Sequence, residues 1–594
     1  MRQQNKYLCM LKWAFLSILI VIGLPITEAN SEPKDKPSPH PLPDNYAAAL
    51  HKALLFFDAQ KSGKLGKENR IPWRGNSGLR DGSGLTDVIV EGGLVGGYYD
   101  AGDNAKFHFP MAFSVTMLSW SVIEYEHKYR ANGEYNHVRD LIKWGADYLL
   151  LTFNSSPKIN QIYTQVGGSR PGSTNPDDNF CWQRPEDMEY PRPVQTTTSG
   201  PDLAGEMAAA LAATSIVFRD NHVYSKKLAE EAKNVFTFAR DPARRAHYST
   251  SNPFIEPYYN STGYYDEYIW GAVWLFYATD NSSYLSLATN PGLARNSGAF
   301  NMTPDLRVFS WDNKLPGAML LLTRVGLFLK PGYPYVDMLN YMHHNITGLT
   351  MCSYLRSNKV FNWTQGGMIE LNRGKPQNLQ YVANAAFLAS VYADYLNATG
   401  LTGWFCGSTF LSLNVLKDFA TLQMNYILGA NPSNMSYIVG YGTKFPRHVH
   451  HRGASIPIDK TRYSCSGGWR WRDASTPNPN IVTGAMVAGP YPSDEFKDVR
   501  TNYTYTEPTL AGNAGFVAAL VSLTMSEGRV GSADPTAVPG EPSEDSSQQP
   551  PTPRQPDPMI HPQTSSSAAF PLTSIVISFP FFLCIRLRFG LFII

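Results

Sequence analysis

Helical stretches recur along this chain from residue 44 to about residue 529, and clear alternating strands are scarce. No change of composition within this span marks a second domain. Long loops separate the stretches, and loops of such length in a compact domain are usually functional. The pattern predicts an all-α fold, a helical toroid over residues 44–529 whose loops form one face. We expect helices at residues 45–60, 138–152, 202–218, 224–238, 270–277, 317–328, 380–396, 415–428 and 513–525.

The charge balance argues against one broad class of function. The chain has 51 Lys and Arg residues and 49 Asp and Glu residues, so its formal net charge is only +2. Because nucleic-acid binding usually needs a basic face, we expect no nucleic-acid partner. Hydrophobic residues make up 43% of the chain and charged residues 17%, a composition that buries a core.

The N-terminal residues have the pattern of a secretory signal. Basic residues precede an apolar run at residues 13–26, and small residues at the right spacing predict cleavage after Ala29. We therefore expect a signal peptide at 1–29 and a polar, Pro-rich linker at 30–43. A retained signal anchor is the alternative, although the apolar run is short for a spanning helix.

The C-terminal residues change character after about Arg529. Residues 530–567 are rich in Pro and Ser and predict an extended stalk, and residues 568–594 form an apolar tail. Small serines before the tail are typical of a lipid-anchor addition signal, but Arg586 and Arg588 interrupt the tail. A lipid-anchor signal, a retained membrane segment and a tail with neither role all stay open. A membrane tether through this tail is one predicted partner.

Cysteine usage gives little support for a metal or a disulfide framework. Four cysteines fall in residues 44–529, namely Cys181, Cys352, Cys406 and Cys465. No CxxC pair suggests zinc, and four cysteines allow three pairings that the sequence cannot separate.

Nine N-x-S/T sequons agree with a glycosylated protein of the secretory pathway, in the cell wall or at the outer face of the plasma membrane. The predicted glycosylation sites are Asn154, Asn260, Asn281, Asn301, Asn345, Asn362, Asn397, Asn434 and Asn502.

The first chemistry-bearing segment is a glycine-rich turn at residues 96–104. Asp100 and Asp103 flank Gly102 in this turn, and the glycines let the backbone bend tightly. Both carboxylates could be aimed at one water molecule. The alternative is a turn in which the aspartates only cap the backbone.

The second segment holds Asp498 and a Glu507-Pro508 pair. A glutamate fixed by the following proline is a candidate acid, provided that burial raises its pKa enough to keep it protonated near neutral pH. The alternative is an ordinary loop glutamate.

The third segment, residues 446–453, carries three histidines and two arginines, including His450 and Arg452. Two cations argue against a metal site, so donors to sugar hydroxyls fit better than ligands. A solvated basic turn is the alternative. Aromatic residues beside acids and amides, as at Trp182, Trp270 and Trp311, suit a sugar cleft, although any one of them is more often a core residue.

Together these segments resemble glycoside hydrolase family nine, the inverting endo-β-1,4-glucanases, and especially its plant KORRIGAN-type members. The resemblance rests on YYDAGD, on SYIVGYGTKFPRHVHHRG at 436–453 and on FKDVRTNYTYTEPTLAGNAG at 496–515, in family order. It also rests on NYAAALHKALLFFDAQKSGKL, SWSVIEYEHKY and MCSYL. The resemblance covers residues 44–527.

The resemblance implies an (α/α)6 barrel, that is a six-hairpin toroid, with a cleft across its loop face. It implies a monomer that acts on β-1,4-glucan chains and needs no cofactor, and some relatives bind a structural calcium near the positions of Asp266 and Glu267. No added carbohydrate-binding module is present in the sequence, so we expect attack on non-crystalline cellulose. The implied site residues are Asp103 as general base, Asp100 as water-orienting helper, Glu507 as general acid, His450 and Arg452 as a substrate-binding pair, Asp498 as a second signature acid, and Trp182, Trp270 and Trp311 as subsite aromatics.

Two other functions compete with a cellulase. One is hydrolysis of another β-linked wall polysaccharide, and the other is glucan binding with a catalytically weak site. Inverting hydrolysis needs a protonated carboxyl and a carboxylate about 6.5–9.5 Å apart, which leaves room for the attacking water. Because Asp103 and Glu507 are far apart in the sequence, only the fold can bring them together.

Overall fold

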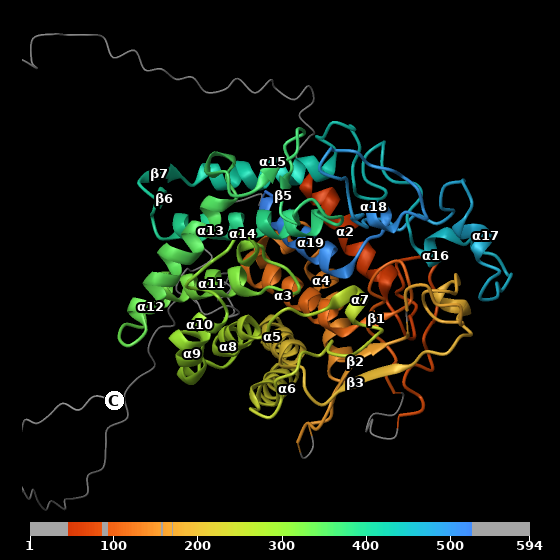
Figure 1. Ribbon diagram of the computed structural model, residues 1–594, viewed down its shortest axis with the longest axis horizontal. Helices are drawn as coiled ribbons and strands as arrows, with labels where there is room; N and C mark the ends of the chain where they lie inside the picture. The colour runs from red at the N-terminus through yellow and green to blue at the C-terminus, as the bar shows by residue number, and fades with distance from the viewer. Residues whose placement is uncertain (1–44, 86–92, 156–157, 169, 526–594) are drawn as a thin grey trace, which may run out of the picture. The chain divides into compact units, whose positions relative to one another are not determined.

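The computed structural model describes residues 45–85, 93–155, 158–168 and 170–525 (Figure 1). The predicted signal peptide at 1–29, linker at 30–43, stalk at 530–567 and tail at 568–594 lie outside the described residues. In the part that is described, no helix combines the length and the apolar character that crossing a bilayer requires.

A closed ring of six inner helices forms the centre of the described chain. Each inner helix contacts the next, and the last contacts the first. Every residue of α5 is buried, and α19 is buried almost throughout, because these helices are apolar on all sides. The inner helices are α3 (His108–Ala131), α5 (Pro201–Val217), α8 (Tyr265–Thr279), α11 (Leu315–Arg324), α14 (Leu379–Ala398) and α19 (Leu510–Leu523).

An outer layer of helices covers this ring. α4 packs on α3, α6 on α5 and α15 on α14. These helices have one apolar stripe and one polar face, as a surface helix should. The outer layer consists of α2 (Tyr46–Gln60), α4 (Tyr135–Leu149), α6 (His222–Arg240), α9 (Ser282–Ala288), α10 (Pro291–Asn296), α12 (Val336–Tyr341), α13 (Gly348–Ser353) and α15 (Asn414–Leu428), with the π-helical turns η3 (Val325–Leu329) and η4 (Met342–Thr347).

Inner and outer helices alternate along the chain, which is the order of an (α/α)6 barrel. The predicted all-α class and barrel are confirmed, and the nine expected helices are present with boundaries shifted by a few residues. The sequence pattern missed α3, although it is the longest inner helix. Its 24 residues are buried on nearly every side, so they show no polar stripe from which a helix could be recognised.

Short elements fill the loops. Three small antiparallel sheets pair β1 (Lys106–Phe107) with β2 (Ile162–Val166) and β2 with β3 (Val194–Thr197), β4 (Asn362–Trp363) with β5 (Ile369–Glu370), and β6 (Gly403–Cys406) with β7 (Thr409–Ser412). The short helices are α7 (Glu256–Tyr259), α16 (Arg452–Ser455), α17 (Trp469–Arg472) and α18 (Tyr503–Thr506), with 3-10 turns η1 (Pro185–Asp187), η2 (Asp305–Arg307) and η5 (Arg356–Asn358).

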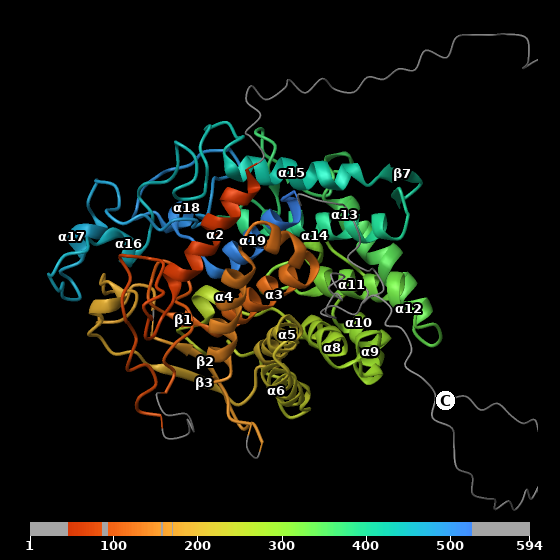
Figure 2. The same cartoon turned by 180° about the vertical axis from the view of Figure 1, so that it is seen from behind.

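The two ends of the barrel differ. We call the end at which the inner helices begin the loop face, and the end at which they finish the back face. α3 and α19 begin shortly after the acidic turn and after Glu507, so these segments belong to the loop face. Figures 1 and 2 show α16, α17 and α18 at one end of the molecule and β6, β7 and α12 at the opposite end.

Two disulfides settle the cysteine pairing that the sequence left open. Cys181 bonds Cys465 and joins two long loops of the loop face, across 284 residues of sequence. Cys352 bonds Cys406 and ties β6 to the end of α13.

Candidate active site

Gly102 is the point at which the three predicted segments meet. Its N–H donates to Glu507 Oε1 at 3.0 Å, and its carbonyl accepts the Arg452 N–H at 2.9 Å. A Cβ added at Gly102 would lie 2.0 Å from the His450 carbonyl oxygen, so no larger residue fits. The fold therefore brings the acidic turn, the His-Arg segment and the Glu507 segment into direct contact.

Asp103 follows Gly102 and is partly exposed. Its Oδ1 accepts the Ala105 N–H at 3.0 Å, which fixes the side chain on its own turn. Burial raises the pKa of Asp103, and the nearby Arg452 cation opposes that rise. The capping role and a role as a base are compatible, because a carboxylate has several acceptor positions.

Asp100 is buried, with 2% of its surface exposed. The Tyr259 hydroxyl donates to its Oδ2, and its Oδ1 has no hydrogen-bond partner among the described residues. Burial raises the pKa of Asp100 to about 8, the Tyr259 hydrogen bond opposes the rise, and Asp103 adds to it. A buried acceptor without a protein partner is suited to hold a water molecule.

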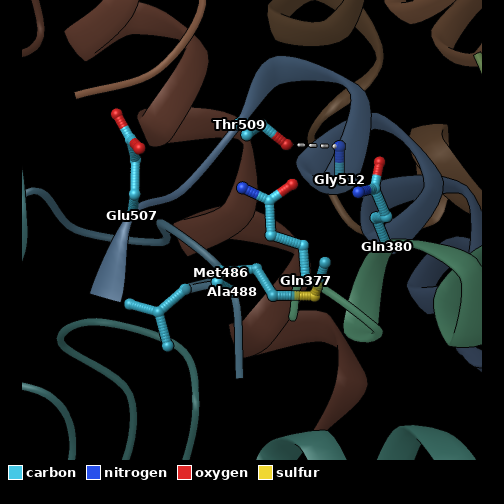
Figure 3. A pocket seen from close by; sticks show the side chains of 8 residues that line it. Gln377, Gln380, Met486, Ala488, Glu507, Thr509 and Gly512 are labelled. Carbon is cyan, nitrogen blue, oxygen red and sulfur yellow. Dashed lines mark hydrogen bonds between the residues drawn. The ribbon is translucent and has the colours of Figure 1, made fainter. Parts of the chain in front are cut away.

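Glu507 lies between α18 and α19, at the edge of a small pocket (Figure 3). Burial and the neighbouring Asp103 raise the pKa of Glu507 to about 8. A carboxyl group with that pKa carries its proton at neutral pH and can donate it. The rest of the pocket is lined by Gln377, Gln380, Met486, Val487, Ala488, Thr509 and Gly512.

His450 stands beside Glu507's segment and is neutral. Burial and the Arg452 cation lower the pKa of His450 to about 3. Its Nδ1 donates to the Arg500 carbonyl oxygen at 2.7 Å. The Trp182 ring packs edge-on against the imidazole at 5.0 Å.

Arg452 and Trp182 form a buried layer beneath this histidine. The guanidinium lies 4.7 Å from the Trp182 ring centre and donates from Nε to the Cys181 carbonyl at 3.0 Å. Both residues are only 3% exposed. Arg452 and His450 both pack on the Trp182 ring, and its role as a subsite aromatic stays a prediction. Contact of Arg452 with substrate stays a prediction.

Asp498 holds the turn that carries the histidines. It accepts the N–H groups of Arg447 and His448 at 2.8 and 2.9 Å, and it lies 3.1 Å from His448 Nδ1. Within the described part of the chain, no hydrogen bond joins Asp498 to the carboxyl groups of the acidic turn or Glu507. These contacts give Asp498 a positioning role, and its catalytic role stays a prediction.

The two remaining tryptophans lie in different surroundings. Trp311 is partly exposed on the loop face, with its ring 4.9 Å from that of Tyr259. Trp270 is fully buried inside the barrel, where it packs edge-on against Trp120 and Trp274. The prediction of Trp270 as a subsite aromatic is wrong, since α8 is an inner helix that has no exposed face.

The predicted calcium position already holds a cation of the protein. The Lys314 ammonium lies 3.2 Å from Glu267 Oε1 and 3.3 Å from Glu206 Oε2, and Asp266 accepts the Lys314 N–H at 2.7 Å. Among the described residues no group of three or more His, Cys, Asp or Glu side chains could hold a metal. The Asp266 bond is to the backbone amide of Lys314 and not to its ammonium. A structural calcium near Asp266 and Glu267 stays a prediction.

Sequence reasoning assigned no role to two residues that build this site, Tyr259 and Arg500. Tyr259 lies in α7 in a stretch with no motif, and only its distance from Asp100 reveals it. Arg500 is 3% exposed and donates to the carbonyls of Trp471, Ala474 and Thr476, which shapes the neighbouring loop.

The sequons lie at or near the surface. Asn154 and Asn502 are half-buried, and their glycosylation stays a prediction together with that of the other seven. The exposed sequon residues are Asn260, Asn281, Asn301, Asn345, Asn362, Asn397 and Asn434.

Comparison with known proteins agrees with the fold and with the three segments. Endoglucanase 12 of Oryza sativa subsp. japonica is 59% identical over 524 residues, which is 88% of this chain and 84% of that protein. The endoglucanase structure of the termite Nasutitermes takasagoensis matches with a TM-score of 0.67 and 33% identity, over 81% of this chain and 98% of that one. The endoglucanase CelQ of Clostridium thermocellum, complexed with cellobiose and cellotriose, matches with a TM-score of 0.62 and 30% identity, over 81% and 70%.

A family model covers the same span. The model for glycosyl hydrolase family 9 matches residues 46–520, which takes in the whole barrel and all three segments that meet at Gly102. With its barrel, its site and its sequence in agreement, this chain belongs to glycosyl hydrolase family 9.

Proposed function

We propose that this glycoside hydrolase is an endo-1,4-β-glucanase, a cellulase that cuts internal β-1,4-glucosidic bonds of non-crystalline cellulose-type glucans with inversion. The endoglucanase names of the plant relatives and the cello-oligosaccharides bound by CelQ support the substrate class. Plant relatives at this identity also support a role in cell-wall organisation.

Glu507 is the general acid of this proposal. It donates its proton to the glycosidic oxygen as the bond to the anomeric carbon breaks, so the leaving chain departs as a neutral alcohol. Its raised pKa keeps the proton in place near neutral pH. The Gly102 N–H bond to Oε1 fixes the direction in which the carboxyl group points.

Asp103 is the general base. It takes a proton from a water molecule that attacks the anomeric carbon from the face opposite the leaving group. Asp100 orients that water by a hydrogen bond at its Oδ1, while Tyr259 holds Oδ2. Proton removal and proton donation then leave the two catalytic carboxyls with exchanged protonation states, which solvent resets.

One observation carries this proposal, namely the double contact of Gly102 with Glu507 and Arg452. It places Glu507 against Gly102, the residue directly before Asp103, although the acid and the base come from opposite ends of the barrel sequence.

The test is Glu507→Gln, which keeps the shape of the side chain and removes the proton. We expect a rate loss of about 10²–10⁴-fold on an unactivated glucan and a smaller loss on an aryl cellobioside whose leaving group needs little acid help. Glu495→Gln, an exposed glutamate of the same loop, is the matched control and should be fully active. Equal losses on both substrates would remove Glu507 from the acid role.

A panel of soluble polymers defines the substrate. We expect turnover of carboxymethylcellulose to exceed that of xylan and glucomannan. Preference for either of the latter would replace the cellulase by a hydrolase of another wall polysaccharide, and binding without turnover would indicate a glucan-binding protein.

We further propose that the protein is a secreted, glycosylated monomer held at the outer face of the plasma membrane by its C-terminal tail. The signal pattern, the sequons and the apolar residues 568–594 support this. Expression of the full chain and of a chain ending at Ser567, followed by membrane fractionation with and without a phospholipase that cuts glycolipid anchors, tests the tether. Equal soluble partitioning of both chains would disprove it.

A further inference from the structure

The β6–β7 hairpin presents two phenylalanines to solvent. Phe405 is 63% exposed and Phe410 is 51% exposed. They are direct partners in the register of the hairpin, and their rings meet edge-to-face at 5.2 Å. We call Phe405 and Phe410 the hairpin pair.

The hairpin is firmly anchored, so this exposure does not arise from a frayed loop. The Cys352–Cys406 disulfide fixes β6 to α13. Trp404, next to Phe405, is buried and donates from Nε1 to Cys352 Sγ at 3.3 Å. One side of the hairpin packs on the barrel while the hairpin pair faces outward.

The composition around the pair is unusual for an exposed hairpin. Residues 399–413 contain no charged side chain, whereas exposed strands normally carry charges that discourage association. Two adjoining exposed phenylalanines without charged neighbours mark an interaction surface. Their edge-to-face arrangement leaves no flat platform on which a sugar ring could stack.

The pair lies on the back face, far from the active site. Gln377 and Gln380, at the start of α14, line the pocket of Glu507. The 20 residues of α14 then lead to the back face, a distance of about 30 Å at the helical rise of ~1.5 Å per residue. Both figures show β6 and β7 opposite the loop-face helices.

The described chain also begins and ends on this face. α2 is an outer helix that starts here, and α19 is an inner helix that finishes here before Met525. Met525 is 85% exposed. The apolar residues 13–26 and 568–594 of the sequence flank these two points.

We propose that the hairpin pair enters the interfacial region of a lipid bilayer and turns the cleft away from it. Phenylalanine is among the side chains that interfacial segments bury at the boundary between headgroups and acyl chains. Two rings bind weakly alone, but a tether raises their effective concentration at the surface. This inference rests on the proposed tether, and it adds the face of the barrel that meets the lipid.

Site-specific quenching tests the proposal on the full chain in a Cys9→Ser/Cys584→Ser background. Ser408→Cys, in the hairpin turn, carries an environment-sensitive dye, and Thr443→Cys, on the loop face, is the matched control. The probe is a phosphatidylcholine and phosphatidylserine vesicle that contains a lipid with a nitroxide on its headgroup. We expect quenching at Ser408→Cys at least about twofold stronger than at Thr443→Cys.

The Phe405→Ser/Phe410→Ser variant distinguishes the membrane contact of the hairpin from that of the C-terminal tether. We expect this variant to lose the quenching at residue 408 and to keep vesicle binding and activity on soluble glucan. Vesicle-bound protein without quenching at 408 would overturn the inference and leave the tether intact. Absence of vesicle binding would overturn both, while glucan turnover in the same sample reports the enzyme separately.

The same samples test two other partners for the hairpin pair, a second copy of the chain and a glycan. A concentration-dependent dimer in light scattering that the double substitution abolishes would assign the pair to a second copy. Quenching that appears only after Asn397→Gln would show that a glycan covers the pair. Either result would contradict lipid contact in the native protein.

Discussion

Two groups of buried carboxyls lie in this barrel, and their surroundings differ. In the interior, Glu206 and Glu267 share the Lys314 ammonium at 3.3 and 3.2 Å. On the loop face, Asp100, Asp103 and Glu507 take part in no ion pair among the described residues. Burial raises the pKa of the carboxyls in both groups, so the bonded cation is what differs. The interior group contains its own counter-ion, and the loop-face group does not.

The difference separates structural acids from acids that do chemistry. A buried carboxylate with a cation beside it is neutralised in place and contributes to the folded state. Asp100 and Glu507 have no bonded cation and pKa values raised to about 8, so they exchange protons near neutral pH, which is a property of functional sites. The substitutions below change either the loop-face carboxyls or the interior carboxyls and their cation.

Asp103→Asn should have the largest effect on the loop-face group. Without the base, turnover should fall by at least about 10²–10⁴-fold, while binding of cellotetraose in calorimetry changes little. Azide should restore part of the rate, because it replaces the activated water. If Asp100→Asn is the more damaging change, base and helper must be exchanged.

Lys314→Met removes the cation that Glu206 and Glu267 share in the barrel interior. Removing the cation leaves two buried carboxyls without a counter-ion, so we expect the free energy of unfolding to fall by about 3–5 kcal/mol. Urea unfolding measures it. The control is Lys417→Met, which breaks the exposed pair with Asp394 and should cost about 0–1 kcal/mol. Similar losses in both variants would mean that the interior cluster is not special.

Trp270→Ala and Trp311→Ala apply the comparison of barrel interior and loop face to two tryptophans. Trp270 is a core residue, so its loss should lower the free energy of unfolding by about 3–5 kcal/mol and leave KM almost unchanged. Trp311→Ala should raise KM about tenfold, which is the effect of losing ~1.4 kcal/mol of binding. A raised KM in Trp270→Ala at full stability would return that residue to the cleft.

The pH dependence gives the smallest effect. The acid must carry its proton, and the pKa of Glu507 is raised to about 8. Activity should therefore persist through neutral pH and decline as the pH rises through about 8. The kcat/KM profile of Glu507→Gln on an activated substrate should lack this decline, whereas that of Asp100→Asn should retain it. A decline near the ordinary glutamate pKa would contradict the buried environment.

Local sequence predicted the loop-face chemistry better than the barrel interior. Asp100, Gly102 and Asp103 form a local pattern, and their residue types and spacing indicate carboxylates aimed at one water molecule. Glu507 could be proposed from its proline and its segment, and the resemblance linked the two. Tyr259 could not be found, because its contact with Asp100 joins distant parts of the chain.

The interior misled sequence reasoning for a physical reason. Trp270, Asp266 and Glu267 lie side by side in the sequence beside other aromatics, and that composition suits a sugar cleft or a cation site. Inner helices are buried on all sides, so their composition does not show which residues face a ligand. Only the contact with Lys314 shows that the acids are already paired.

The stereochemistry of the first product tests the central claim that Asp103 activates water opposite Glu507. Proton NMR of a cello-oligosaccharide digest, recorded before mutarotation, distinguishes the two anomers. We predict that fresh product carries the α anomer, since water enters from the face opposite the β-linked leaving chain. An initial β anomer would mean retention of configuration and would contradict the role of Asp103 as a water-activating base.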